Sequence, residues 1–361
     1  MLKQQKIFFD FLRFCIGSAT EIPDSLKEAD WEELYAIAQK QCLVGVLFDG
    51  IRKLTAEQVG MKKELLLQWI AESQMLEKAN VRLNDAAIQV SEWFRKKGFR
   101  TCILKGQGNA LMYSNPYSRT PGDIDIWVEG GDKRGISFVR TISPHEKACY
   151  HHIEFPSYKG VEVEVHYRPS FLLCFWHNGK LQKYYERVKE QQFSHRVLLG
   201  EQGDVAIPTA EFNLIFQLTH IFSHLMNEGI GLRQLLDYYY VLISDDLLLI
   251  RDRVQKELRE LGLWKFAGGI MYIMQKVFGM PASRLIVPPN EKYGRFVLNE
   301  VLEAGNFGRH DARNRFRRTQ LGHNLQRVYR DMRLVKYFPA EAMSEPFFRI
   351  WHFFWRMKNK K

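Results

Sequence analysis

Residues 103–128, which read ILKGQGNALMYSNPYSRTPGDIDIWV, constrain the fold of this chain more than any other stretch. The first residues are apolar, and positions 105–108 read KGQG, a turn sequence, because glycine adopts backbone angles that other residues avoid. Residues 109–113 favour a short helix, which Pro116 and Pro121 end. Residues 123–128 alternate polar and apolar side chains, the pattern of a half-buried strand. The stretch therefore predicts a strand, a turn, a short helix, a loop and a second strand.

The second strand brings two carboxylates together. In a strand, residues i and i+2 lie on one face, about 6.6 Å apart, so Asp123 and Asp125 project together while Ile124 and Ile126 face the other side. Neighbouring carboxylates repel each other unless a positive charge lies between them, and oxygen ligands suit Mg²⁺. The pair therefore indicates a metal site, with a polar strand edge at a loop exit as the simpler alternative.

A later segment offers a third carboxylate. Residues 161–166 read VEVEVH, so Glu162, Glu164 and His166 share one face of a predicted strand and the valines share the other. This face either contacts solvent or lies beside Asp123 and Asp125. In the second case both glutamates are candidates for the third carboxylate, and the pattern alone does not separate them.

These features occur in a characteristic order along the chain: Leu104-Lys105-Gly106, Arg119, Asp123-Ile124-Asp125 and Glu164-Val165-His166. The ordered set resembles the nucleotidyltransferase superfamily, whose core is similar to that of DNA polymerase beta, and within it a largely uncharacterised bacterial branch. The resemblance covers roughly residues 95–245. It implies an α+β fold, with a nucleotidyltransferase-type mixed β-sheet core flanked by helical N- and C-terminal regions.

The resemblance also implies an activity, the metal-dependent transfer of a nucleoside monophosphate from a nucleoside triphosphate to a hydroxyl, with release of pyrophosphate. Asp123, Asp125 and Glu164 would be the catalytic residues and would bind two Mg²⁺ or Mn²⁺ ions, one activating the hydroxyl and one holding the triphosphate. The residues expected to contact the nucleotide are Lys105, Gly106, Gln107, Arg119 and His166. The acceptor stays open between a small molecule, a protein side chain and RNA.

One departure from the superfamily supports a second hypothesis. The turn usually reads Gly-Ser or Gly-Gly, whereas Gly106 is followed here by Gln107, so a hydroxyl that often contacts phosphate is absent. The chain could therefore be a catalytically weak nucleotide- or RNA-binding module that kept the fold. The net charge of +11 suits an anionic partner under either hypothesis.

The rest of the chain is divided into regions by its periodicity. We expect a helical region over 1–98, including an amphipathic helix over 62–97; a core over 99–204; and a helical region over 205–361. Within the core, residues 133–142 favour a helix, and strands over 151–155 and 161–167 form a hairpin with a loop at 156–160. On a helix near 232–238, Arg233 and Asp237 are four residues apart and predict a surface ion pair, although the family resemblance also lets Asp237 orient substrate.

Histidines raise the possibility of zinc. His151, His152 and His166 fall in one predicted strand pair, and His220 and His224 are four residues apart on a predicted helix. Ile and Phe follow the first histidine of the second pair, so the segment does not match H-E-x-x-H. We therefore expect no zinc site, and expect His166 to orient a carboxylate or contact substrate.

The C-terminal region is basic and aromatic. Arginine is dense between 305 and 336, at positions 309, 313, 315, 317, 318, 327, 330 and 333, which indicates either a solvated helix face or a surface for an anionic partner such as tRNA or a membrane. The tail at 347–357, FFRIWHFFWRM, suits a docking helix, an oligomer contact or an interfacial membrane element.

Localisation follows from what the sequence lacks. The five cysteines include no C-x-x-C pair and indicate reduced thiols. The N-terminus has no secretory signal, and no apolar run reaches the roughly 18–20 residues of a membrane span. We expect a cytoplasmic protein without a transmembrane segment, of open oligomeric state.

Overall fold

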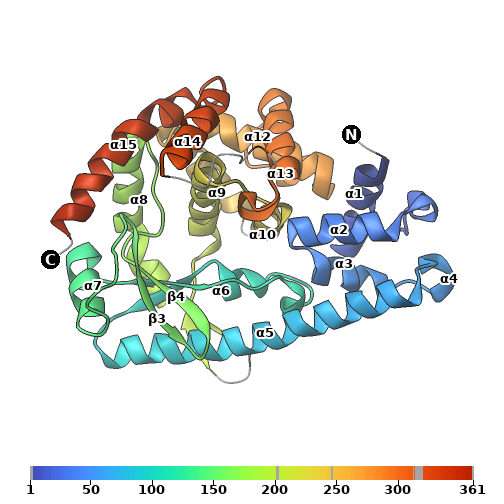
Figure 1. Ribbon diagram of the computed structural model, residues 1–361, viewed down its shortest axis with the longest axis horizontal. Helices are drawn as coiled ribbons and strands as arrows, with labels where there is room; N and C mark the ends of the chain where they lie inside the picture. The colour runs from blue at the N-terminus through green and yellow to red at the C-terminus, as the bar shows by residue number, and fades with distance from the viewer. Residues whose placement is uncertain (1–2, 201–202, 245–246, 312, 314–319, 360–361) are drawn as a thin grey trace.

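The computed structural model describes residues 3–200, 203–244, 247–311, 313 and 320–359. A small mixed sheet lies between the long helix α5 and a group of helices from both ends of the chain (Figure 1). This is the α+β architecture that the sequence predicted. Four short 3₁₀ helices complete it: η1 (Asp24–Glu28), η2 (Pro116–Ser118), η3 (Ala282–Arg284) and η4 (Asn306–Gly308).

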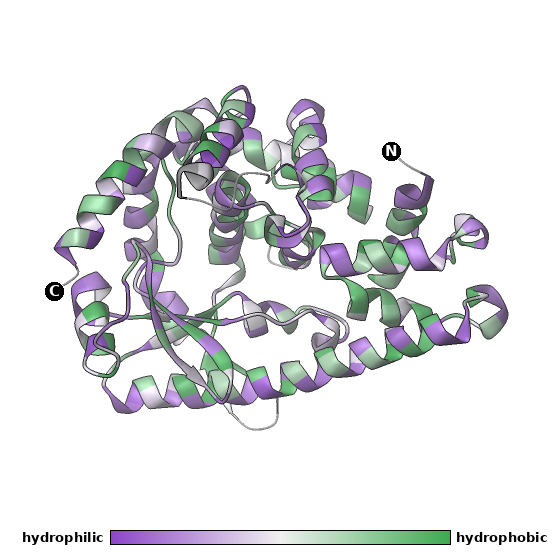
Figure 2. Cartoon of the chain, in the orientation of Figure 1, coloured by the Kyte–Doolittle hydropathy of each residue, from purple (hydrophilic) through white to green (hydrophobic). Residues whose placement is uncertain are grey.

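The N-terminal region is helical, as predicted. Its helices are α1 (Lys3–Cys15), α2 (Trp31–Gln41), α3 (Val44–Ile51), α4 (Ala56–Val59) and α5 (Lys63–Lys96). The α5 helix is 34 residues long and runs along one edge of the molecule, with hydrophilic and hydrophobic turns alternating along it (Figure 2). It ends just before Gly98, whose φ of +81° suits a helix terminator.

The sheet carries the predicted strands. They are β1 (Thr101–Leu104), β2 (Ile124–Val128), β3 (His152–Tyr158) and β4 (Val161–His166), in the spatial order β1-β2-β4-β3. The central strand β2 is antiparallel to β1 and parallel to β4, while β3 is antiparallel to β4. Two helices connect the strands, α6 (Gly106–Ala110) and α7 (Gly131–Arg140).

The two faces of the sheet have different neighbours. Ile124, Ile126 and Val128 belong to a hydrophobic core that also contains the C-terminal half of α5 and residues of α7. The alternating side chains Asp125 and Trp127 face the opposite side. The period of two along β2 therefore buries one set of side chains and presents the carboxylates on the other face.

The β3–β4 turn is tighter than predicted. We expected a loop at 156–160, but β3 continues to Tyr158, and only Lys159 and Gly160 connect the strands, with φ values of +51° and +78°. Two residues with positive φ match the geometry of the two-residue hairpin turns. A register shift between Phe155 and Tyr158 accommodates Pro156, which has no N–H to donate to the ladder.

The C-terminal region supplies most of the remaining helices. The helix α8 (Phe175–Ser194) was not predicted from the sequence. A hairpin of β5 (Arg196–Leu198) and β6 (Asp204–Ala206) follows it. The later helices are α9 (Ala210–Asn227), α10 (Leu232–Leu242), α11 (Leu247–Glu260), α12 (Trp264–Phe278), α13 (Glu291–Ala304), α14 (Gln320–Leu334) and α15 (Pro339–Lys358). The side chain of Thr209 accepts the N–H of Phe212 and caps the start of α9. None of the helices in the described ranges is long and apolar enough to cross a membrane.

The terminal regions share one core. Side chains of α1 and α3, such as Leu12 and Leu47, belong to the same hydrophobic cluster as Ile215 of α9 and Ile270 of α12. The α5 helix instead packs mainly on the sheet along its second half. The division at 98 and 204 stays a prediction, since the helical regions on either side of the sheet fold around a common interior.

Candidate active site

Three carboxylates meet on the polar face of the sheet. In the parallel pairing of β2 with β4, Asp125 is the direct partner of Glu164. Oxygen atoms of Asp123, Asp125 and Glu164 lie within 4.8 Å of one another. Glu162, the other candidate for the third position, is exposed to solvent and is not a member of this group. The structure therefore places Glu164, and not Glu162, beside the two aspartates.

Two cations neutralise Asp125. Lys105 Nζ lies 2.8 Å from Asp125 Oδ2, and His166 Nε2 lies 2.7 Å from Asp125 Oδ1. Burial alone would raise the pKa of Asp125, but Lys105 and His166 hold it well below its usual range. Burial lowers the pKa of His166, yet its hydrogen bonds with Asp125 and Glu164 outweigh that and raise it to about 9. Asp125 is therefore ionised at neutral pH beside a protonated imidazole.

Lys105 reaches Asp125 from an unusual backbone conformation. It follows β1 directly and has φ of +52° and ψ of −141°, which is rare for a residue other than glycine. Gly106 follows with φ of +45° and turns the chain into α6. Backbone strain of this kind is found mainly at functional sites, and here it directs an ammonium group at the carboxylates.

Asp123 is less well neutralised. Among the residues that the structure describes it forms no ion pair, and the charge of Asp125, followed by burial, raises its pKa to about 6. A carboxyl group whose pKa is raised by a neighbouring carboxylate lacks a compensating positive charge. The three oxygen donors and this deficit of positive charge fit a divalent cation of the Mg²⁺ type.

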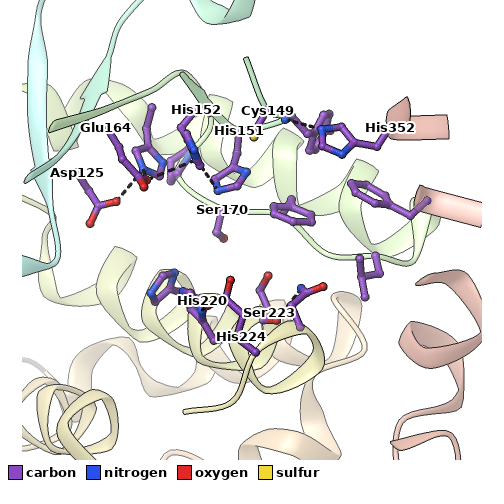
Figure 3. Close-up of a pocket in the computed structure, with 18 of the residues that line it drawn as sticks. Asp125, Cys149, His151, His152, Glu164, Ser170, His220, Ser223, His224 and His352 are labelled. Atoms are coloured by element: carbon purple, nitrogen blue, oxygen red, sulfur yellow. Dashed lines mark hydrogen bonds and ion pairs between the residues drawn. The ribbon is translucent and has the colours of Figure 1, made fainter. Parts of the chain in front are cut away.

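The carboxylates line a cavity of about 580 Å³ between the sheet and α9. Figure 3 shows Glu164, His151 and His152 on one side and His220, Ser223 and His224 of α9 on the other. The sequence offered two separate groups of histidines, which the structure places across one cavity, and His352 of α15 is a sixth histidine of the lining. His352 belongs to the aromatic tail at 347–357, where no spacing links it to the other histidines.

Most of these imidazoles are neutral. Burial, with the charge of His166 second, lowers the pKa of His152 to about 4, and burial also lowers the pKa of His352 to about 4. The pKa values of His151 and His220 are lowered well below the usual range, again mainly by burial. At neutral pH the cavity therefore offers uncharged imidazoles together with the charged His166 and Lys105.

Arg119 has a different partner from the one expected. Its Nε and Nη2 each donate to a carboxylate oxygen of Asp237 at 2.8 Å, and both side chains are buried. The predicted surface pair of Arg233 with Asp237 is therefore wrong, because α10 is buried along its length and the bidentate partner comes from the loop before β2. Arg233 donates instead to the carbonyl of Thr120 at 3.0 Å. The contact of Arg119 with phosphate stays a prediction, and its guanidinium is engaged by Asp237.

Gln107 does not reach the cavity with its side chain. The side chain is buried and donates through Nε2 to Asn84 of α5, while Gly106 lines a small side cavity of about 40 Å³ next to Asp123. The first turn of α6 directs the Gln107 side chain toward α5. The contact of Gln107 with the nucleotide stays a prediction.

Comparisons with known proteins relate the chain to a family and to a solved structure. A family model described as "Uncharacterised nucleotidyltransferase" matches residues 27–279, which include all three carboxylates and end before α13. A search of curated proteins found no match. Among solved structures, the chain is similar to an antigenic nucleotidyltransferase-like protein from Paracoccidioides brasiliensis, with 14% identity, a TM-score of 0.28 and coverage of 52% of this chain and 90% of that chain.

Proposed function

The chain belongs to the family described as uncharacterised nucleotidyltransferases, and from this premise we propose that it transfers a nucleoside monophosphate from a nucleoside triphosphate to a hydroxyl acceptor. The observation that carries this proposal is the group of Asp123, Asp125 and Glu164, whose oxygens lie within 4.8 Å of one another at the cavity wall. Carboxylates gathered this closely are costly without a cation, so a stable protein that keeps them has a use for one.

The three carboxylates would hold Mg²⁺ or Mn²⁺, which oxygen donors suit. A divalent cation bound there supplies Lewis acidity, which lowers the pKa of an attacking hydroxyl and neutralises phosphate charge. In the structure Lys105 and His166 supply positive charge to Asp125. Lys105 can turn from Asp125 to the phosphates of the triphosphate, since its ammonium group also lines the cavity.

The transfer is a substitution at the α-phosphorus. The acceptor oxygen forms the new bond to phosphorus, the bond to the bridging oxygen breaks, and pyrophosphate leaves with the electron pair. We assign the acceptor proton to a carboxylate oxygen of Glu164, which opens to the cavity and whose Oε2 lies 3.2 Å from His166 Nε2. Arg309 and Arg327 at the cavity wall offer positive charge to the departing pyrophosphate.

The acceptor would contact a wall that lies outside the matched family region. Phe307, Phe348 and His352 line the cavity and all follow residue 279. The carboxylates and Lys105 lie inside that region. The part of the chain beyond the matched family region thus faces the reacting groups, and acceptor choice would depend on it.

One observation favours the second hypothesis, a nucleotide- or RNA-binding module without strong catalysis. The ion pair of Lys105 with Asp125 satisfies a catalytic carboxylate from within the protein. Such a module would bind triphosphates without Mg²⁺ and would lose affinity steeply with salt. An enzyme would need Mg²⁺ for the productive complex, so the metal distinguishes the two.

The reaction can be tested with nucleoside triphosphates labelled at the α- or the γ-phosphate, incubated with Mg²⁺ and a fractionated cell extract as the source of acceptor. We expect the α-label to appear on an acceptor and the γ-label in pyrophosphate. Asp123→Asn should abolish both products, whereas Glu162→Gln, an exposed change on the same strand face as Glu164, should preserve them. Transfer of the γ-label to the acceptor would show a phosphotransferase instead.

A further inference from the structure

The outer surface of α15 is apolar and uncovered. Met343, Phe347, Ile350, Phe354 and Met357 recur at intervals of four and three residues, so they form one stripe along the helix. Each of these residues is between 53 and 69% exposed. We propose that this stripe, with the basic residues around it, docks the protein onto a bilayer surface that contains anionic lipid.

The opposite side of α15 belongs to the cavity. Glu345, Phe348, Arg349 and His352 line it. Since successive residues of a helix are about 100° apart, these positions lie on the other side of the helix from Phe347 and Phe354. The α15 helix, along the upper left edge of the molecule in Figure 1, therefore separates the candidate active site from the outer stripe.

The apolar surface extends beyond α15. The ring of Phe175, in the first turn of α8, contacts Trp351 of α15 with a centroid distance of 5.8 Å, and the neighbouring Trp176 is 72% exposed. The adjacent helix α14 exposes a second stripe at helical spacing, made by Leu325, Val328, Tyr329 and Met332. Large contiguous apolar patches on a soluble protein surface mark interaction sites, and Phe and Trp are typical of helices that lie in a membrane interface.

The C-terminal part of the sequence, which contains α14 and α15, is strongly basic. Residues 305–361 contain 14 Lys and Arg against four Asp and Glu, a net charge of +10, whereas the whole chain carries +11. Lys358 on α15 is exposed beside the stripe, and Lys180 of α8 lies over the ring of the exposed Trp176, 5.4 Å from its centroid. A partner for this surface must therefore be both anionic and able to bury apolar side chains.

An anionic bilayer meets both requirements. Its head groups attract Lys and Arg, and its acyl boundary takes up the Phe, Ile and Met side chains. A nucleic acid would satisfy the arginines but would present its phosphates to an apolar stripe. A second copy of the chain would cover the stripe but would bring two strongly basic surfaces together. This inference goes beyond the proposed function and does not depend on it.

The test is co-sedimentation of the full-length protein with vesicles of phosphatidylcholine alone and of phosphatidylcholine mixed with phosphatidylglycerol. We expect binding to the mixed vesicles that weakens as salt is added. Phe347→Ser/Phe354→Ser should lower the partition coefficient about a hundredfold, because each buried Phe contributes roughly one factor of ten. The matched control is Leu248→Ser/Leu249→Ser, two exposed apolar residues on α11, which should bind like the wild type.

A second variant separates the electrostatic contribution. Lys180→Gln/Lys358→Gln should weaken binding to the mixed vesicles and keep the melting temperature, since neither side chain is buried. Wild-type protein that stays in the supernatant with mixed vesicles at low salt would overturn the proposal. A sedimentation measurement that finds a dimer dissociated by the Phe347→Ser/Phe354→Ser change would assign the stripe to a second copy and would also overturn it.

Discussion

Asp125 of β2 and Glu164 of β4 are direct partners across a parallel strand pair. This register creates the carboxylate group, because Val163 and Val165 on either side of Glu164 face the hydrophobic core. A slip of one residue would turn Glu164 into that core and bring a valine to the cavity. The packing of the apolar face thus fixes the chemistry of the opposite face.

The buried pair of Arg119 and Asp237 should be structural. Asp237→Asn leaves a buried guanidinium without its counter-charge, which costs about 3 kcal/mol of the free energy of unfolding. Urea denaturation measures this loss. The control is Asp204→Asn, which breaks an exposed pair with Arg196 and should leave the curve unchanged. Equal, negligible effects of both changes would contradict the buried pairing.

Lys105 should compete with a divalent cation for Asp125. Lys105→Met removes the ammonium 2.8 Å from Asp125, so the variant should melt at a lower temperature than the wild type without Mg²⁺. Added Mg²⁺ should then raise the melting temperature of the variant more than that of the wild type, because the cation no longer displaces a lysine. The same change at the exposed Lys159 is the control. A smaller effect of Mg²⁺ on Lys105→Met would argue against competition.

Gln107 should matter for stability and not for nucleotide binding. Its buried amide donates to the half-buried Asn84, so Gln107→Ala should cost about 1 kcal/mol of the free energy of unfolding by removing this hydrogen bond. Isothermal titration should give the same Kd for a nucleoside triphosphate as in the wild type. A Kd weakened at least about tenfold (about 1.4 kcal/mol) in a folded variant would show that this side chain contacts the ligand.

Asp331 of α14 should make stability depend on pH. Burial and the charge of Glu345 raise its pKa from 3.8 to about 7. Between these values the folded protein holds a proton that the unfolded chain has lost, so the free energy of unfolding falls as the pH rises from about 4 to about 7. The side chain of Asp331→Asn cannot ionise, so above about pH 7 the variant should be more stable than the wild type. Near pH 4 the two proteins should be equally stable. Stability profiles that run parallel for the two proteins would refute this account.

Much of the core could be predicted from the sequence because its signals are local. Strict alternation predicted the faces of β2 and β4, and helical periodicity over 62–97 predicted α5, which spans Lys63–Lys96. The grouping of Asp123, Asp125 and Glu164 followed from that alternation together with the family resemblance. Positive φ values at Lys159 and Gly160 show why the hairpin turn was misjudged, since a lysine in that conformation gives no signal in the sequence.

Long-range partners could not be predicted in this way. The spacing of Arg233 and Asp237 favoured a local pair, but Arg119, more than a hundred positions away, makes better bidentate geometry in a buried setting. Likewise no periodicity could place His352 of α15 in the same cavity as His220 of α9. The choice between Glu162 and Glu164 also needed the register of the β2–β4 pair, which the sequence of one strand does not contain.

The measurement that tests the central claim most directly is thermal melting with each nucleoside triphosphate, with and without Mg²⁺, on the wild type and on Asp123→Asn. A ligand that binds the native state raises its melting temperature. We predict a Mg²⁺-dependent rise with at least one triphosphate in the wild type and none in the variant. Without ligand the variant should melt no lower than the wild type, because the repulsion between Asp123 and Asp125 is gone. A rise that is independent of Mg²⁺, or one that Asp123→Asn retains, would contradict the carboxylate site.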